Sequence, residues 1–339
     1  MHHFYSDTQT RPPKAMREAA LSVELGDERH DEDPSTNELC ERVAAMLGME
    51  AAVFLPSGTM CNEIAIAVHC RPGDEIICTR ESHIIFAESG GPAALSGTML
   101  YPIDGERGML SPEQVEEAIR PRSAHAPRSR LLVAEQTSNL AGGAVWPLEQ
   151  LRAVADTAKA AGLATHLDGA RLLNAQVATG IAAGDYARGF DSAWIAYTKG
   201  LACPVGAVLA GSKSFIEEAW LLKRRWGGAM RQTGVLTAMC LWALDHHVER
   251  LAEDHALAAK IGQRLERSPA IKRVLPVETN IVIADLSDAA PDAPTAARRL
   301  REKQLSVTVV GKRRIRIVTH LEVDEAAAEV LLNAIDALV

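Results

Sequence analysis

The sequence lacks the patterns that mark several common kinds of protein. Its six cysteines form no C-x-x-C pair and no cluster with histidine at zinc spacing, so we expect reduced thiols and no metal site. No apolar run is long enough to cross a bilayer. The first residues show no basic region followed by an apolar core, as a signal peptide would. These absences predict a cytoplasmic protein.

Charge and glycine patterns argue against two further classes of protein. The chain carries 36 basic and 44 acidic residues, a net charge of -8, without a sustained basic run. Neither nucleic acid nor an anionic membrane is therefore expected as its main partner. No G-x-G-x-x-G follows the first predicted strand, which argues against a dinucleotide-binding protein.

Apolar strands and amphipathic helices alternate through the first two thirds of the chain. The predicted strands cover 51–55, 75–78, 98–103, 130–135, 163–168, 194–197 and 205–210. The main predicted helices among them cover 36–47, 60–69, 112–120, 147–161 and 213–225. This alternation predicts an α/β fold with a mostly parallel, doubly wound sheet.

The last third predicts a smaller second α/β domain. A long helical pattern over 235–265 would bridge into it. Strands are expected at 279–284, 305–310 and 314–318, and helices at 295–303 and 323–338. With 339 residues, the chain is long enough for one large and one smaller domain.

Two predicted strands end in residues that suggest carbonyl chemistry. Lys199 follows a buried strand and enters a Gly/Pro-rich turn, and Asp168 ends another buried strand. Burial lowers the pKa of an ammonium and yields a neutral amine that can form a Schiff base. Pyridoxal phosphate needs such a lysine for its aldehyde and an acid that keeps its pyridinium nitrogen charged. Taken alone, Lys199 would more often be an edge or capping residue.

Two more strand ends carry polar residues. The turn Ser57-Gly58-Thr59 precedes a predicted helix, whose free N–H groups and dipole suit a phosphate, although such turns also merely cap helices. His83 follows the next strand and could equally be a satisfied polar residue. Ligands bind at the carboxyl ends of the strands in such sheets, so these residues, Asp168 and Lys199 are expected to converge.

Together these stretches resemble the low-specificity L-threonine aldolases of the pyridoxal-phosphate fold-type I superfamily. The matching pieces are SDTQTRP at 6–12, FLPSGT at 54–59, His83 with ESGG at 88–91, EQTSN at 135–139 before GG at 142–143, HLDGAR at 166–171, TKG at 198–200, GGAMRQ at 227–232 and RIVTHL at 316–321. The pieces span nearly the whole chain in family-like order and spacing.

The resemblance implies an aspartate aminotransferase-like fold with a mostly parallel seven-stranded sheet in the large domain. It divides the chain into an N-terminal segment, 1–34, which contributes to the small domain and the active site, a large cofactor domain, 35–240, and a small C-terminal domain, 241–339. It also implies a homo-oligomer, dimer or tetramer, with shared active sites and a small amino acid as substrate.

The resemblance also assigns roles to individual residues. Lys199 would bind the cofactor aldehyde, Asp168 its pyridinium nitrogen and His83 its ring, while the phosphate would be held by Ser57, Gly58, Thr59 and Arg231, the last from a neighbouring subunit. Ser6, Arg171 and Arg316 resemble the polar set for the substrate carboxylate, where a guanidinium pairs in a bidentate way. Arg171 is also expected to contact the cofactor. His125 matches a histidine near the β-hydroxyl, and the base is His83, His125 or a water.

The implied reaction is a retro-aldol cleavage of β-hydroxy-α-amino acids, such as threonine, allo-threonine or phenylserine-like compounds, to glycine and an aldehyde. The nearest alternative is a β-eliminating lyase or dehydratase, which would give a keto acid and ammonia. An aminotransferase and a non-catalytic cofactor-binding protein are less favoured.

The chain departs from the family pattern at two places near the substrate side chain. It has His30-Asp31 where members commonly have Tyr-Gly, and Ala87 where an aromatic residue is common. Losing two aromatic side chains enlarges the pocket, and His30 could pair with a polar substituent. We hypothesise that the best substrate has a larger or more polar side chain than threonine.

Overall fold

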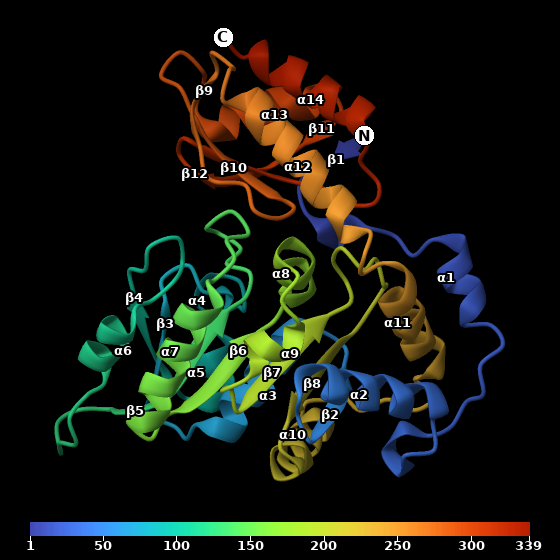
Figure 1. Cartoon of the computed structure of the whole chain (residues 1–339), viewed down its shortest axis with the longest axis vertical. Helices are drawn as coiled ribbons and strands as arrows, with labels where there is room; N and C mark the ends of the chain where they lie inside the picture. The colour runs from blue at the N-terminus through green and yellow to red at the C-terminus, as the bar shows by residue number, and fades with distance from the viewer.

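Seven strands form the central sheet of the larger, lower body in Figure 1, in the order β2-β8-β7-β6-β5-β3-β4. The computed structural model describes all 339 residues. The strands are β2 (Ala51–Leu55), β3 (Asp74–Thr79), β4 (Met99–Ile103), β5 (Arg128–Glu135), β6 (Ala164–Asp168), β7 (Ser192–Ala196) and β8 (Ala207–Gly211). Strand β8 is antiparallel to both of its neighbours, and all other pairs are parallel. The mostly parallel sheet predicted from the sequence is confirmed.

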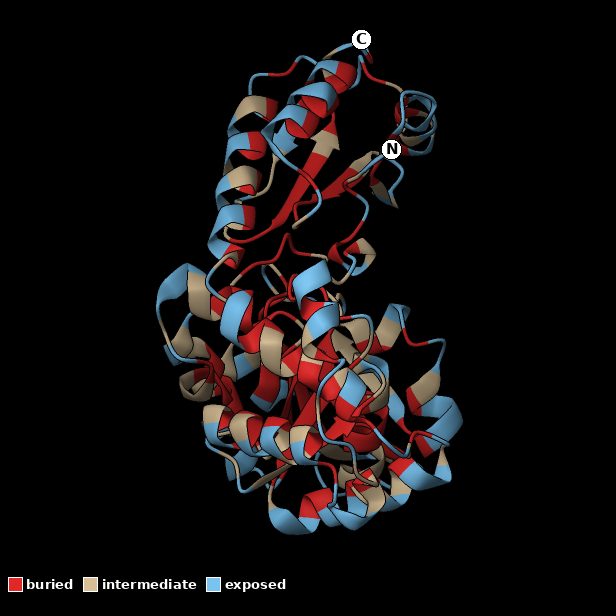
Figure 2. Ribbon diagram, turned by 90° about the vertical axis from the view of Figure 1, so that its right-hand side faces the viewer, coloured by how far each residue is buried: buried red, intermediate tan, exposed pale blue.

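Both faces of this sheet are covered by helices. Along β8, Val208 and Ala210 enter the largest apolar core while Leu209 enters a second core on the opposite face. Figure 2 shows the strands almost wholly buried and many helices exposed on their outer sides. The helices up to the second body are α1 (Lys14–Ala19), α2 (Pro34–Leu47), α3 (Gly58–His69), α4 (His83–Phe86), α5 (Gly91–Ser96), α6 (Pro112–Ala118), α7 (Leu148–Ala160), α8 (Leu172–Thr179), α9 (Ala183–Ala187), α10 (Lys213–Arg225) and α11 (Gly234–His246).

The smaller body is built on a four-stranded antiparallel sheet in the order β12-β13-β10-β9. Its elements are α12 (Leu251–Leu265), β9 (Ile271–Val274), β10 (Ile281–Leu286), α13 (Ala293–Glu302), β11 (Leu305–Ser306), β12 (Thr308–Gly311), β13 (Arg314–Val318) and α14 (Glu325–Asp336). None of the helices in either body has the length and apolar character of a membrane span.

The N-terminal residues belong to the smaller body. Strand β1 (His2–His3) pairs in parallel with β11, and Phe4 is fully buried in the apolar core of that body. The next residues, Ser6 and the 3₁₀ turn Asp7–Gln9, then run to the junction of the two bodies. The first ten residues therefore connect the smaller body to the carboxyl edge of the large sheet.

The prediction of a single helix over 235–265 is wrong. The chain forms α11 and α12 instead, separated by a turn at 247–250 where the ring of His247 hydrogen-bonds the carbonyl of Leu201 over 2.8 Å. The turn contains no glycine or proline that would reveal it in the sequence. The change in direction follows instead from the packing of the two helices. Helix α11 packs in the large core, and the buried face of α12 packs in the smaller one. The boundary expected at 240/241 falls within α11.

Candidate active site

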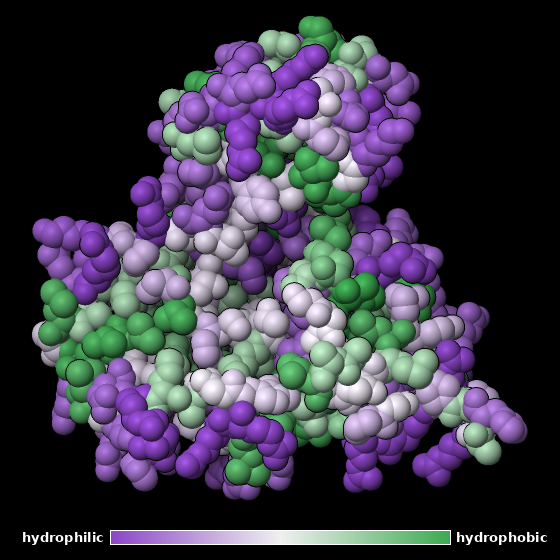
Figure 3. All heavy atoms as spheres, turned by 180° about the vertical axis from the view of Figure 1, so that it is seen from behind, coloured by the Kyte–Doolittle hydropathy of each residue, from purple (hydrophilic) through white to green (hydrophobic).

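A cavity of about 500 Å³ lies between the two bodies, at the carboxyl edge of the large sheet. The space-filling view from behind shows the surface hollowed where the bodies meet (Figure 3). Residues from both bodies line the cavity: Tyr5, Ser6, Thr8, His83, Phe86, Ala87, Glu135, Asn139, Leu140, Ala170, Arg171, Lys199, Thr308, Val309, Val310 and Arg316. The site therefore requires segments that are far apart in the sequence.

Lys199 reaches this cavity three residues after the end of β7. Burial lowers the pKa of its ammonium, and nearby Arg171 lowers it further, against the opposing charges of Asp168, Asp7 and Glu135. The nitrogen lies 5.4 Å from the centroid of the Trp194 ring. At a given pH, a larger fraction of Lys199 is therefore in the neutral amine form, which attacks a carbonyl, than of a free lysine.

Asp168 is a buried and firmly held carboxylate. Its Oδ2 accepts a hydrogen bond from Asn62 over 2.9 Å, and its Oδ1 accepts one from the Ala170 amide over 3.0 Å. The residue after it must be glycine, since a Cβ at Gly169 would lie 1.9 Å from the Trp194 carbonyl oxygen. This buried acid can pair with a protonated ring nitrogen near Lys199.

Asn62 orients the carboxylates of the site, and sequence reasoning missed it. Its Nδ2 donates to Glu88 over 2.7 Å as well as to Asp168. Its Oδ1 accepts from Trp194 Nε1 over 2.8 Å and meets His166 Nε2 at 3.1 Å. All four hydrogen-bonding positions of the amide are used. The available signal was a polar residue within an otherwise apolar stretch of α3, which is weak.

His83 is held from two sides at the cavity wall. Its Nδ1 lies 2.6 Å from Glu88 Oε1, and its backbone N–H donates to Glu135 over 2.9 Å. Burial alone would lower the imidazole pKa, but the hydrogen bond to Glu88 and the charges of Asp168, Glu135 and Glu88 raise it overall. Because Glu88 can only accept at this contact when it is ionised, the Nδ1 proton of His83 is fixed there.

Glu135 is a second site residue that has no role in the predictions from sequence. It ends β5 and is buried, and its Oε1 accepts from the Asn139 amide over 2.9 Å. Burial, with the charge of Asp168, raises its pKa to about 7. A carboxyl group with this pKa beside Lys199 is typical of functional sites.

Arg316 has an unused donor in the cavity wall. Its Nη1 donates to Asn139 over 2.6 Å and its Nη2 to the Tyr5 carbonyl over 3.3 Å, but its buried Nε has no partner. Burial lowers its pKa to about 10. A buried guanidinium with an unpaired donor suits a ligand carboxylate.

Arg171, expected to bind the same carboxylate, is already paired. Its Nε and Nη2 donate to the two oxygens of Asp7 over 2.8 and 2.7 Å. Burial would raise the pKa of Asp7, but Arg171 holds it well below its usual range. Ser6 also lines the cavity, and its Oγ accepts from the Thr8 amide over 3.2 Å. Of the two arginines, Arg316 therefore has the free donor.

The turn Ser57-Gly58-Thr59 starts α3 outside the cavity lining. Ser57 Oγ accepts from the Met60 amide over 3.2 Å, and Ser57 and Thr59 are exposed. A Cβ at Gly58 would lie 2.1 Å from the Trp194 ring, so only glycine fits. This helix start offers free N–H groups to an anion. With Lys199, Asp168 and the unpaired Arg316 Nε, the donor set fits pyridoxal phosphate and an amino acid.

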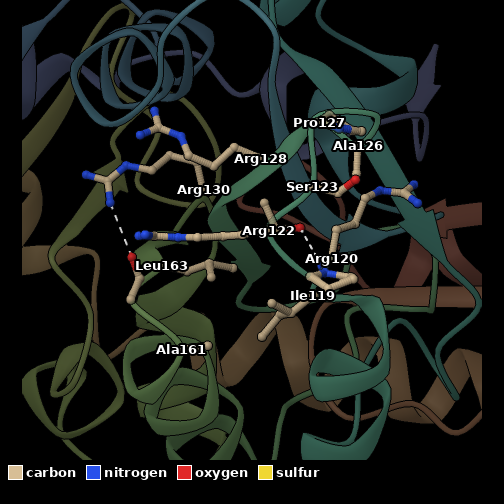
Figure 4. A pocket seen from close by; sticks show the side chains of 13 residues that line it. Ile119, Arg120, Arg122, Ser123, Ala126, Pro127, Arg128, Arg130, Ala161 and Leu163 are labelled. Atoms are coloured by element: carbon tan, nitrogen blue, oxygen red, sulfur yellow. Dashed lines mark hydrogen bonds between the residues drawn. The ribbon is translucent and has the colours of Figure 1, made fainter.

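Besides Asp168 and the turn at 57–59, three expected site residues lie outside the cavity lining of a single chain. His30 is exposed, and Arg231 is exposed with its Nη1 donating to the Met230 carbonyl over 2.9 Å. His125 lies on the exposed connector before β5, at the opposite end of that strand from Glu135. Near it is a second cavity, of about 490 Å³, whose wall carries Arg120, Arg122, Arg128 and Arg130 (Figure 4). The roles of these three residues stay predictions.

Comparison with known proteins gives a consistent assignment. The beta-eliminating lyase family profile matches residues 3–289. Low-specificity L-threonine aldolase 1 of Arabidopsis thaliana is 38% identical over 324 residues, which cover 94% of this chain and 90% of that protein. The Leishmania major threonine aldolase structure has a TM-score of 0.85 at 21% identity, covering 100% of this chain and 99% of that chain. Thermus thermophilus aspartate aminotransferase has a TM-score of 0.73 at 18% identity, covering 99% and 96%.

These matches confirm the aspartate aminotransferase-like fold and the family resemblance expected from the sequence. The identity to the plant protein extends over nearly the whole of both chains. The chain belongs to the low-specificity L-threonine aldolases, within the beta-eliminating lyase family.

Proposed function

We propose that this protein is a pyridoxal-phosphate-dependent aldolase that cleaves β-hydroxy-α-amino acids to glycine and an aldehyde. The observation that carries the proposal is the placement of Lys199 and Arg316 in the wall of one cavity, the lysine with a lowered pKa and the arginine with an unpaired buried donor. The buried carboxylate of Asp168 lies outside this wall, close enough for its charge to act on Lys199. Bound pyridoxal phosphate would supply an electron sink for the pair left on Cα when Cα–Cβ breaks.

The chain's own residues divide the remaining work. Lys199, Asp168, His83 and the Ser57-Gly58-Thr59 turn would hold the cofactor. Arg316, aided by Ser6, would bind the substrate carboxylate and thereby orient the substrate. Because the Nδ1 proton of His83 is held by Glu88, its Nε2 is the ring nitrogen left to accept the β-hydroxyl proton.

The outer wall of the cavity favours a large apolar substituent on the substrate. Tyr5, Phe86 and Val309 line it and are 47%, 46% and 38% exposed, and the short side chain of Ala87 leaves room beside them. Since His30 is not in this wall, we propose the larger rather than the more polar substituent. The expected order of kcat/KM is phenylserine above threonine above 3-hydroxyaspartate, and a clear preference for threonine would contradict it.

We also propose an oligomer in which Arg231 serves a neighbouring subunit's phosphate site, because it is exposed and outside its own cavity. Mixed oligomers test this. Arg231→Ala and Lys199→Ala should each be nearly inactive alone, whereas subunit exchange between them should restore part of the activity. Two variants that stay inactive after exchange would refute sharing.

The deciding experiment for the reaction combines a spectrum with a product analysis. A yellow protein whose visible band is bleached by borohydride, and which releases equal amounts of aldehyde and glycine from phenylserine, is expected. A keto acid with ammonia would instead identify the β-eliminating alternative, which the matching family's name keeps in view. A protein that stays colourless with added cofactor would overturn the proposal.

A further inference from the structure

Two buried glutamates, Glu88 beside His83 and Glu63 beside Glu88, leave three carboxylate oxygens without a hydrogen-bond donor. These are both oxygens of Glu63 and Oε2 of Glu88, and the two residues are 3% and 4% exposed. A buried carboxylate with no donor is so unfavourable that such groups usually take up a proton. Neither residue belongs to the set that the family resemblance assigned.

The two side chains meet below the turn that follows Glu88. Glu63 packs so closely under this turn that a Cβ at Gly91 would lie 2.0 Å from its Oε1. Its carboxyl group is within hydrogen-bonding reach of Glu88. The donors that Glu88 does have, Asn62 Nδ2 and His83 Nδ1, both contact Oε1. Oε2 of Glu88 has no donor, and the neighbouring carboxyl group of Glu63 can supply one only when it is protonated.

We infer that Glu63 is protonated at neutral pH and donates this proton to Glu88, so that the pair holds one negative charge directed at His83. Burial and the neighbouring charge of Glu88 raise the pKa of Glu63 to about 8, which agrees with this arrangement. Glu63 is then a positioning residue, since it acts on His83 only through Glu88.

This arrangement places the single charge of the pair beside the imidazole. The charged groups that face His83 are Glu88, Glu135 on β5 and Asp168 on β6. Glu88 alone of these holds the ring, and its donor from Glu63 fixes which oxygen faces His83. The catalytic consequence rests on the proposed function, whereas the shared proton does not.

Thermal unfolding of the holoenzyme as a function of pH tests the proton itself. An unfolded glutamate ionises near pH 4.5, so the wild type should lose stability as the pH rises from about 4.5 to about 8. Glu63→Gln keeps a donor and cannot ionise. The Tm of this variant minus that of the wild type should therefore increase by about 2 °C or more between pH 5 and pH 8. The exposed control Glu41→Gln should show a constant difference. A constant difference for Glu63→Gln would overturn the inference.

Activity against phenylserine tests the consequence. Glu63→Ala removes the donor, so Glu88 should bind the His83 proton more tightly, moving the acid limb of the kcat profile to higher pH and lowering kcat about tenfold with little change in KM. Glu63→Gln should restore most of this loss. Equal losses in both variants would refute the positioning role. If the wild type itself lacked aldolase activity, the proposed function would fail while the unfolding series still decided the shared proton.

Discussion

Two cavities of nearly equal size lie at opposite edges of the same sheet, and both contain arginines. At the carboxyl edge, about 500 Å³ is bounded by Lys199, Glu135 and Arg316. At the amino edge, about 490 Å³ is bounded by four arginines (Figure 4). Arg128 there is 54% exposed and pairs with Asp74, and Arg120 is 36% exposed and pairs with Glu75.

The charged side chains at the two edges differ in how deeply they are buried and in whether they are paired. The cavity volumes and the presence of arginine do not distinguish the edges. Arg316 is buried with an unpaired nitrogen, and Glu135 and Lys199 have pKa values displaced by burial. At the amino edge, Arg120 and Arg128 are partly exposed and pair with carboxylates, and Arg130 donates to the carbonyls of His69 and Gly162. Charges that are buried without full partners mark the edge that is prepared for a ligand.

The largest expected effect comes from removing the lysine of the carboxyl edge. Lys199→Ala should lower kcat/KM for phenylserine by roughly 10⁴-fold and abolish the borohydride-sensitive band, because no other side chain offers the amine. Arg128→Ala at the amino edge is the matched control and should stay within about twofold of the wild type. A large loss in that control would erase the distinction between the edges.

Breaking the buried pair between the two bodies should have the next largest effect. Asp7→Ala leaves the Arg171 guanidinium buried and unpaired, so the free energy of unfolding should fall by about 3–5 kcal/mol in a denaturant titration. Because the pKa of Asp7 is depressed, its stabilising contribution is present above about pH 4 and is lost on acidification. The loss caused by Asp7→Ala should therefore shrink at low pH, and a loss independent of pH would argue against this pair.

Removing the free donor of the carboxyl edge should act on substrate binding and catalysis. Arg316→Ala should lower kcat/KM by about 10²-fold, mainly through KM, because the substrate carboxylate loses its charged partner. Arg316→Lys keeps the charge but not the fork, and should recover only part of the loss. An unchanged KM in both variants would remove Arg316 from the carboxylate site.

A smaller effect is expected on the pH dependence of thermal stability, which should depend on Glu135 at the carboxyl edge. Glu135 has a pKa raised to about 7, so its contribution to stability falls as the pH rises from about 4.5 towards 7. The Tm of Glu135→Gln relative to the wild type should rise by about 2 °C over that range. The difference for Glu149→Gln, an exposed residue on α7, should not vary with pH.

The smallest effect is expected for an ion pair at the amino edge. Arg128→Ala breaks a pair whose arginine is 54% exposed, so it should cost less than about 1 kcal/mol of unfolding free energy. Added salt should reduce even this difference, because exposed charges are screened. A loss as large as that of Asp7→Ala would show that exposure does not govern the two edges.

The sequence predicts most of this fold because its strands are continuous apolar runs. Strand β2 was predicted with its observed bounds, Ala51–Leu55, and β6 to within one residue at its start. The turn between α11 and α12 was missed, because it depends on the contact of His247 with Leu201 and not on a local breaker.

Strand direction predicts part of the site, and the family resemblance supplies Ser6, Ala87, Arg171 and Arg316, which also line the cavity. His83 and Lys199 follow strands that end at one edge, so parallel pairing brings them together. Glu135 ends a strand at the same edge, so strand direction could also have placed it in the site. Asn62 acts through hydrogen bonds to residues that are distant along the chain, such as Asp168, 106 positions away. Sequence patterns report nearest neighbours and strand ends, and they carry little information on such pairings.

The pairing of β1 with β11 has a consequence for synthesis on the ribosome. The second residue of the chain pairs with Leu305, so the first strand has no partner until some three hundred further residues have been made. At ordinary translation speeds this delay is roughly 15 to 60 s. During that time β1 and Phe4 lack the strand and the apolar core against which they pack. Nascent chains and chains terminated before residue 316 would therefore lack an assembled site, and catalytic competence would begin only after Arg316 has been made.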